Sequence, residues 1–143
     1  MAGHVTITLP KDRSQPGALV LRDEQGAALF SAQCLGQGKA RHGQLQPRGD
    51  TPTGRYGPTF IAHFATRAAG IGKLWCALVA DEMFDTPASA AERAGRIGLG
   101  IHGGRGDFVL VPTHGSIRLL DRDMADFARA AGKMRFTVEI VEA

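Results

Sequence analysis

The segment Ile101–Leu119, IHGGRGDFVLVPTHGSIRL, determines how this chain can be organised, because it places two histidines, a serine and an arginine around glycine-rich turns. Two apolar runs, Ile97–Ile101 and Phe108–Val111, are typical of buried strands, and each is followed by a polar turn that contains glycine. Side chains at strand ends are held rigidly while they stay accessible to a ligand. We therefore expect the ends of these two strands to form a functional site.

Three polar side chains are expected to meet at these strand ends. His102 follows the first strand, whereas His114 and Ser116 follow the second. An imidazole within reach of a hydroxyl is the arrangement that activates a nucleophile. Glycines at 103, 104 and 115 leave room for backbone to approach a ligand, so that the N–H groups of Gly115 and Ser116 could point at one oxyanion. This pattern predicts a site for acyl transfer.

The same residues resemble the catalytic motifs of the L,D-transpeptidase (YkuD-like) family of bacterial cell-wall enzymes. In that family a histidine ends a strand, and Ser/Thr-His-Gly-Cys, followed by an apolar residue and Asn or Arg, comes later in the chain. Here His102 is followed by Thr113–Arg118, THGSIR. Upstream, Gly49–Gly54, GDTPTG, resembles the TPTG turn of the family. One position departs from the pattern, because Ser116 stands where the family has its nucleophilic cysteine.

The resemblance implies a mostly β, compact, sandwich-like catalytic fold with one or two short helices, and a reaction that uses no cofactor. It also implies a substrate, the stem peptide of peptidoglycan. The nucleophile would attack the carbonyl between the third and fourth stem residues and release D-alanine. The acyl group would then pass to an amine of another stem, giving a cross-link or an exchange, or to water.

The resemblance also implies a role for individual residues. Ser116 holds the position of the nucleophile, His102 is the base, the Gly103 carbonyl orients that base, and the Gly115 N–H receives the oxyanion. Four further side chains would either shape the turn or contact the substrate: Thr113, His114, Arg118 and Tyr56. Tyr56 could equally belong to the core, because an aromatic residue after the TPTG turn is not specific to a site.

Ser116 leaves three interpretations open. Cysteine beside histidine is readily a thiolate near neutral pH, whereas a serine must lose its proton to the base during attack. We expect the serine form to be slower than a cysteine form by on the order of 10³ or more. The serine is therefore a replacement of the native cysteine, the mark of a naturally inactive peptidoglycan-binding relative, or the nucleophile of a working serine enzyme in which Asp107 or Asp121 supplies the acid.

Composition and charge narrow the class of protein. A chain of 143 residues forms one domain, residues 1–143, with a single core. Nineteen glycines beside seven Phe, one Trp and one Tyr favour short strands joined by turns. The net charge of +3 comes from Lys and Arg residues that are spread along the chain, which argues against nucleic-acid binding. The sequence leaves the oligomeric state open.

Two features of the sequence bear on where the protein is located, and they point in different directions. No window approaches the roughly 18 apolar residues of a membrane span. The start of the chain, MAGHVTITLPKDRSQ, lacks the features of a secretory signal. The resemblance nevertheless implies the cell envelope or periplasm. We therefore expect either that a leader has been removed or that the protein reaches the envelope by another route, for example as a secreted antibacterial effector.

Local patterns predict the remaining elements. Alternation over Val5–Leu9 predicts a strand that ends at Pro10, and the polar segment Gly36–Gly54 predicts a long loop. Further strands are expected over Ala18–Arg22, Ala27–Leu35, Tyr56–Phe64, Lys73–Ala80 and Arg135–Val141. One helix is expected from the cap Thr86 through Arg93, and another from the cap Asp121 to Gly132 with one apolar face formed by Met124, Phe127, Ala128 and Ala131.

Three other signals do not point to sites. Cys34 and Cys76 lie in apolar stretches, which favours buried thiols, although the spacing leaves a disulfide between them open. Glycines at 98, 100 and 103 spell GxGxxG, but the chain then runs toward a strand instead of opening a helix, so that nucleotide binding is not expected. His102 and His114 have no third ligand at a suitable offset, and we expect no metal.

Overall fold

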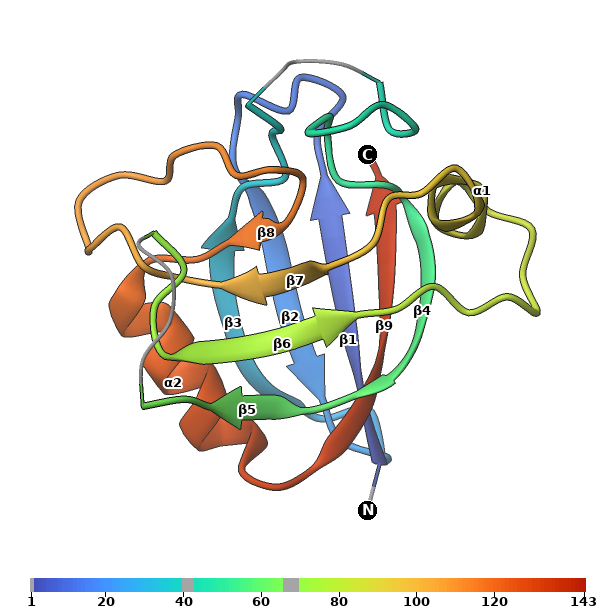
Figure 1. Ribbon diagram of the computed structural model, residues 1–143. Coiled ribbons are helices and arrows are strands. Elements are labelled where there is room, and N and C mark those ends of the chain that lie inside the picture. The colour runs from blue at the N-terminus through green and yellow to red at the C-terminus, as the bar shows by residue number, and fades with distance from the viewer. Residues whose placement is uncertain (1, 40–42, 66–69) are drawn as a thin grey trace.

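The computed structural model describes residues 2–39, 43–65 and 70–143. Two β-sheets pack against each other, and the strands of the smaller sheet run across those of the larger one (Figure 1). The helix α2 (Asp121–Ala131) lies beside β3 (Ala28–Cys34), whereas α1 (Pro87–Arg93) lies beside β4 (Gly54–Thr59) on the other side. The prediction of a mostly β, compact, sandwich-like fold with one or two short helices is confirmed, with two sheets and two helices in the described residues.

The larger sheet has the strand order β3-β2-β1-β9-β4. At its centre, β1 (Ala2–Leu9) pairs antiparallel with β2 (Gly17–Arg22) and parallel with β9 (Arg135–Glu142). Every second side chain of β1 is fully buried, and these are Val5, Ile7 and Leu9. This is the alternation expected of a strand that covers a core on one face.

The smaller sheet carries the candidate site and has the order β5-β6-β7-β8. Its elements are β5 (Ile61–His63), β6 (Leu74–Leu78), β7 (Leu99–His102) and β8 (Ile117–Arg118). β7 pairs antiparallel with β6 and parallel with β8. One face of these strands is turned into the core through the fully buried residues Cys76, Ile101 and Ile117. The intervening side chains therefore lie on the opposite face.

Both predicted helices form. Thr86 caps α1 and shares a capping box with Ser89, and Pro87 takes the first position of the helix. The predicted apolar face of α2 is buried, with the Phe127 ring 5.6 Å from Phe30 and 5.7 Å from Phe136 between ring centroids. The prediction that Asp121 caps α2 is wrong, because Leu120 is the cap residue and makes no side-chain cap bond.

The sequence prediction of a buried strand over Phe108–Val111 is wrong. This run is irregular, Phe108 is fully exposed, and Val109 is 61% exposed. Pro112 follows and has no N–H to offer a sheet, while the Val111 carbonyl accepts a hydrogen bond from Arg118. The strand that pairs with β7 comes later, over Ile117–Arg118. A short apolar run alone does not distinguish a strand from a loop.

Two other predicted strands have different limits. The strand expected over Tyr56–Phe64 divides into β4 and β5, which belong to different sheets. Pro58 lies where the pairing of β4 with β9 shifts register, because proline cannot donate to a ladder. The strand expected from Ile97 begins at Leu99, and Ile97 is 76% exposed. Of the predicted loop Gly36–Gly54, residues 40–42 lie outside the described residues.

Both cysteines are free and fully buried, so no disulfide joins them. Burial raises the pKa of each thiol from 9.0 to about 12. We expect neither thiol to react with a thiol reagent at about pH 8 until denaturant is added, and both to react afterwards. The unfolded chain loses these protons near pH 9 and the folded chain only near pH 12, so the free energy of unfolding should fall as the pH rises above about 9. Rapid labelling without denaturant would contradict this burial.

Candidate functional site

A pocket of about 330 Å³ lies on the face of β6, β7 and β8 that is turned away from the core. We call it the site pocket. Its lining joins strand residues to the glycine-rich turns and consists of Lys39, Gly70, Ile71, Trp75, Gly98, His102, Arg105, Thr113, His114, Ser116 and Arg118. The structure thus brings His102, His114 and Ser116 together, as the sequence predicted.

The His102 ring is held in one orientation. Its Nδ1 lies 2.8 Å from the carbonyl oxygen of Gly103, and a carbonyl can only accept a hydrogen bond. Nδ1 therefore carries the proton, and in the neutral ring Nε2 has the lone pair that a general base needs. The Trp75 ring stacks on His102 with 5.4 Å between centroids and 21° between planes. His102 is the last residue of β7 and is 4% exposed.

Ser116 lies immediately before β8, beside Gly100 of the neighbouring strand. Because Ile101 pairs with Ile117 in parallel register, Ser116 is a diagonal neighbour of His102 on the same face. Its Oγ accepts a hydrogen bond of 3.0 Å from the Gly100 N–H, and the residue is 6% exposed. Gly100 cannot be replaced without movement, because a Cβ there would come within about 2.5 Å of the Trp75 ring.

The turn before Ser116 is fixed by Thr113. The Thr113 hydroxyl donates to the Ser116 carbonyl at 2.8 Å and accepts from the Gly115 N–H at 3.0 Å. Gly115 has a φ of +112°, a conformation that side chains disfavour. In this conformation the Gly115 N–H, which was expected to receive an oxyanion, is bonded to Thr113. The exposed His114 side chain lies at the rim.

Arg118 lines the site pocket, but its guanidinium is bonded to backbone carbonyls of the surrounding turns. It is 3% exposed and donates to the Gly103 carbonyl, the same oxygen that accepts from His102, at 2.7 Å. It also donates to the carbonyls of Gly70, Val111 and Pro112. Burial lowers the pKa of Arg118, the charge of Arg105 lowers it further, and Asp121 raises it. Of the two roles that the sequence left open for Arg118, the structure favours support of the turn.

Two carboxylates hold the loop that follows His102. Asp121 accepts from the backbone N–H of Gly104 at 2.5 Å and from that of Gly106 at 2.9 Å. Asp107 accepts from the Arg122 N–H at 2.7 Å. The carboxylates of Asp121 and Asp107 therefore accept hydrogen bonds from backbone N–H groups. The His102 Nδ1–H is bonded to the Gly103 carbonyl instead of to either carboxylate.

Tyr56 belongs to the core and does not line the site pocket. It is 3% exposed, and its hydroxyl donates to the Pro52 carbonyl at 2.6 Å. Burial raises the pKa of this phenol, so it stays protonated. The expectation of a substrate contact by Tyr56 is replaced by a role in fixing the TPTG-like turn.

The TPTG-like turn contacts the site directly through Thr51, whose hydroxyl lies 3.2 Å from the Ser116 carbonyl oxygen. Arg96, which the sequence analysis missed, also joins the two turns. It donates to the carbonyls of Asp50 at 2.8 Å, Gly49 at 3.1 Å and His114 at 3.4 Å, and it is 8% exposed. A Cβ on Gly115 would overlap its guanidinium. Nothing in the local sequence distinguishes this arginine from exposed ones.

Arg96→Ala is expected to lower the free energy of unfolding by about 3 kcal/mol, because buried carbonyls would lose their donor. Denaturant unfolding followed by circular dichroism measures this. The matched control is Arg93→Ala at the end of α1, whose side chain is 56% exposed and pairs with exposed Glu82 and Asp85. The control should change the free energy of unfolding by less than about 0.5 kcal/mol. Equal losses of the free energy of unfolding in the two variants would contradict the conclusion that Arg96 holds the two turns together.

The rim of the site pocket is positively charged. Lys39, Arg105 and His114 are exposed there, and no Asp or Glu is among its described lining residues. Lys39 and Arg105 also line an adjoining pocket of about 570 Å³ beside Val111 and Pro112. Two pockets that share these basic residues suit an elongated ligand that carries carboxylates. Within residues 2–39, 43–65 and 70–143, no three His, Cys, Asp or Glu side chains are placed to hold a metal ion.

Comparisons with known proteins identify a structural neighbour. The fold is similar to the crystal structure of the helical cell shape determining protein Pgp2 from Campylobacter jejuni, with a TM-score of 0.64 and 17% sequence identity. The match covers 99% of this chain and 48% of that one, so this chain spans about half the length of Pgp2. No family model matches the sequence, and no curated protein matches it. The similarity therefore shows a shared fold.

Proposed function

We propose that the site pocket is an acyl-transfer site of the L,D-transpeptidase type, which takes the stem peptide of peptidoglycan. The observation that carries this proposal is that Ser116 and an oriented base, His102, line one pocket. His102 presents Nε2 as the basic nitrogen because its Nδ1–H is bonded to the Gly103 carbonyl. The resemblance of His102, THGSIR and GDTPTG to the family motifs supports the same reaction.

The reaction would proceed through a covalent acyl-enzyme. The nucleophile at position 116 attacks the stem-peptide carbonyl while its proton moves to His102 Nε2. The Ser116 N–H is the proposed oxyanion donor, and the Gly115 N–H would join it once its bond to Thr113 opens. D-Alanine then leaves with the proton from His102, and an amine or water attacks the acyl group.

Charge at the rim supports an anionic substrate. Lys39 and Arg105 lie between the site pocket and the adjoining pocket, where they would pair with stem-peptide carboxylates. A role in the cell envelope would agree with the name of the structural neighbour, a protein that determines cell shape. No helix among the described residues is long and apolar enough to span a membrane.

One observation favours a second candidate function. The Ser116 hydroxyl replaces the family's cysteine and is engaged by the Gly100 N–H. With so weak a nucleophile, the pocket would hold a stem peptide without cleaving it. The second candidate is therefore a non-catalytic peptidoglycan-binding domain.

Released D-alanine distinguishes the two functions. The protein and its Ser116→Cys variant would be incubated with a stem tetrapeptide, and binding would be followed by NMR on the same samples. Turnover by the cysteine variant supports the acyl-transfer site. Binding without turnover by either form supports the binding domain, and absence of binding by both forms contradicts both functions.

A further inference from the structure

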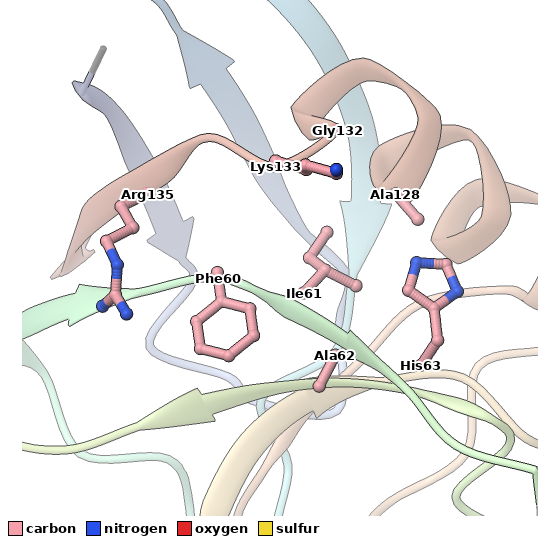
Figure 2. A pocket seen from close by; sticks show the side chains of 8 residues that line it. All are labelled: Phe60, Ile61, Ala62, His63, Ala128, Gly132, Lys133 and Arg135. Atoms are coloured by element: carbon pink, nitrogen blue, oxygen red, sulfur yellow. The ribbon is translucent and has the colours of Figure 1, made fainter.

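Another pocket lies at the edge of the smaller sheet, between β5 and the end of α2 (Figure 2). We call it the edge pocket. It has a volume of about 690 Å³ and is lined by Phe60, Ile61, Ala62, His63, Ala128, Gly132, Lys133 and Arg135. None of these residues lines the site pocket. The edge pocket is therefore a separate feature that acyl transfer does not use.

The backbone of β5 has hydrogen-bonding groups directed away from its sheet. The Phe64 N–H donates to the Lys73 carbonyl, so Phe64 and Lys73 form a hydrogen-bonded pair of the β5–β6 ladder. Bonded and non-bonded pairs alternate in an antiparallel ladder, so Ala62 and Trp75 form the next bonded pair. The N–H and C=O groups of Ile61 and His63 consequently point outward. Among the described residues, no hydrogen bond to these outward groups is found. β5 is the terminal strand of its sheet.

Small residues leave space beside this edge. Ala128 and Gly132 face the pocket from α2 and its end, and neither has a side chain that would keep another backbone away (Figure 2). An extended chain can therefore lie along β5 at strand spacing, which is roughly 4.8 Å. The apolar contact available to it is the Phe60 ring, which is 46% exposed, because the Ile61 side chain is packed in the core.

The charges around the edge pocket are of one sign. Lys133 and Arg135 extend around the same opening as the His63 ring, and Arg135 lies over Phe60 with its guanidinium carbon 5.2 Å from the ring centroid (Figure 2). All three side chains belong to exposed residues, and no Asp or Glu is among the described lining residues. A partner with acidic side chains matches this charge.

We propose that β5 is a docking edge for an extended, acidic polypeptide segment, which adds to the smaller sheet as a further strand. Backbone bonds to the exposed residue His63 would hold the segment, while Lys133 and Arg135 would select acidic side chains. This inference does not depend on the proposed acyl transfer, because it uses different residues and a different pocket.

The test uses a short peptide in which glutamate alternates with valine, and a matched peptide with glutamine in place of glutamate. Binding to the full chain would be followed by NMR and by hydrogen exchange. The glutamate peptide should bind at least about tenfold more tightly, and it should slow exchange of the His63 amide. Equal binding of the two peptides, or no binding of the glutamate peptide, would overturn the proposal. Shifts confined to the Lys133 and Arg135 side chains would indicate a simple anion site and would also overturn it.

Two variants of His63 distinguish the contribution of its backbone N–H to peptide binding from that of its side chain. His63→Pro removes the imidazole ring together with an N–H that the sheet does not use, and proline is tolerated at such edge positions. His63→Ala keeps the N–H and removes the ring. His63→Pro should bind the glutamate peptide about fivefold more weakly than His63→Ala, as expected for one lost hydrogen bond. Equal affinities of the two variants would contradict strand addition, and the exchange measurement on the unaltered chain remains decisive if His63→Pro fails to fold.

Discussion

The Ser116→Cys variant is expected to release D-alanine from a stem tetrapeptide at least about 10³ times faster than the serine protein. The reason is nucleophile activation. A cysteine at this position can give its proton to the oriented His102 before attack, whereas a serine hydroxyl must lose it during attack. The surroundings are already in place, because the Thr113 and Thr51 hydroxyls bind the backbone carbonyl of residue 116 and the Gly100 N–H faces its side chain. Enzymatic quantification of D-alanine over time gives both rates.

Ser116→Ala is the matched control for this gain of activity. It keeps the fold and pocket but has no nucleophile, so it should release no D-alanine above background. If the cysteine variant also stays at background while it binds the tetrapeptide, acyl transfer is the wrong assignment and the binding domain is favoured. If the serine protein already matches the cysteine variant, the activation argument is wrong.

His102→Ala, added to Ser116→Cys, is expected to lower D-alanine release by about 10³. The ring is the proposed base, and it also reprotonates the leaving amine. The matched control is His114→Ala in the same background. His114 lines the same pocket but is exposed at the rim, so its loss should change the rate constant for turnover by less than about tenfold.

The thermal unfolding of both histidine variants should be measured as a control, because His102 stacks on Trp75 and removal of its ring would loosen β7. His102→Gln offers a second check, since it retains a side chain of similar length but no base. Unchanged turnover in His102→Ala would show that another group takes the proton. An equal loss in both histidine variants would show that the pocket has been disturbed as a whole.

Three buried arginines explain how such glycine-rich loops hold one conformation. Arg13, Arg96 and Arg118 each donate to backbone carbonyls near the site, among them that of Thr51. Loops without regular pairing leave carbonyls unsatisfied, and a planar guanidinium can bind several at once. The basic composition of the chain therefore has a structural use in addition to charging the rim of the pocket.

Most of the fold could be predicted from local patterns, because β1, the hairpin of β2 and β3, and the buried face of α2 follow simple periodicities. The irregular conformation of Phe108–Val111 could not, since Phe108 and Val109 are exposed and local apolar patterns do not distinguish such a run from a buried strand. The break between β4 and β5 could not be predicted either, because it falls at Phe60, where the chain passes from the larger sheet to the smaller one.

The candidate site was predictable only where residues are close in sequence. The spacing and the family resemblance pointed to His102 and Ser116, and the structure brings both into one pocket. Arg96 and Trp75 were missed because their contacts come from distant parts of the chain. Roles for Arg118 and Tyr56 depended on burial, which the sequence does not reveal for a polar side chain.

The most direct test of the central claim is the intact mass of the Ser116→Cys variant after brief incubation with a stem tetrapeptide. An acyl-enzyme predicts an added mass equal to the tetrapeptide minus D-alanine, located by digestion to the peptide that contains position 116. The adduct should be absent from Ser116→Ala. A cysteine variant that binds the tetrapeptide but never gains this mass would contradict a covalent acyl-transfer site.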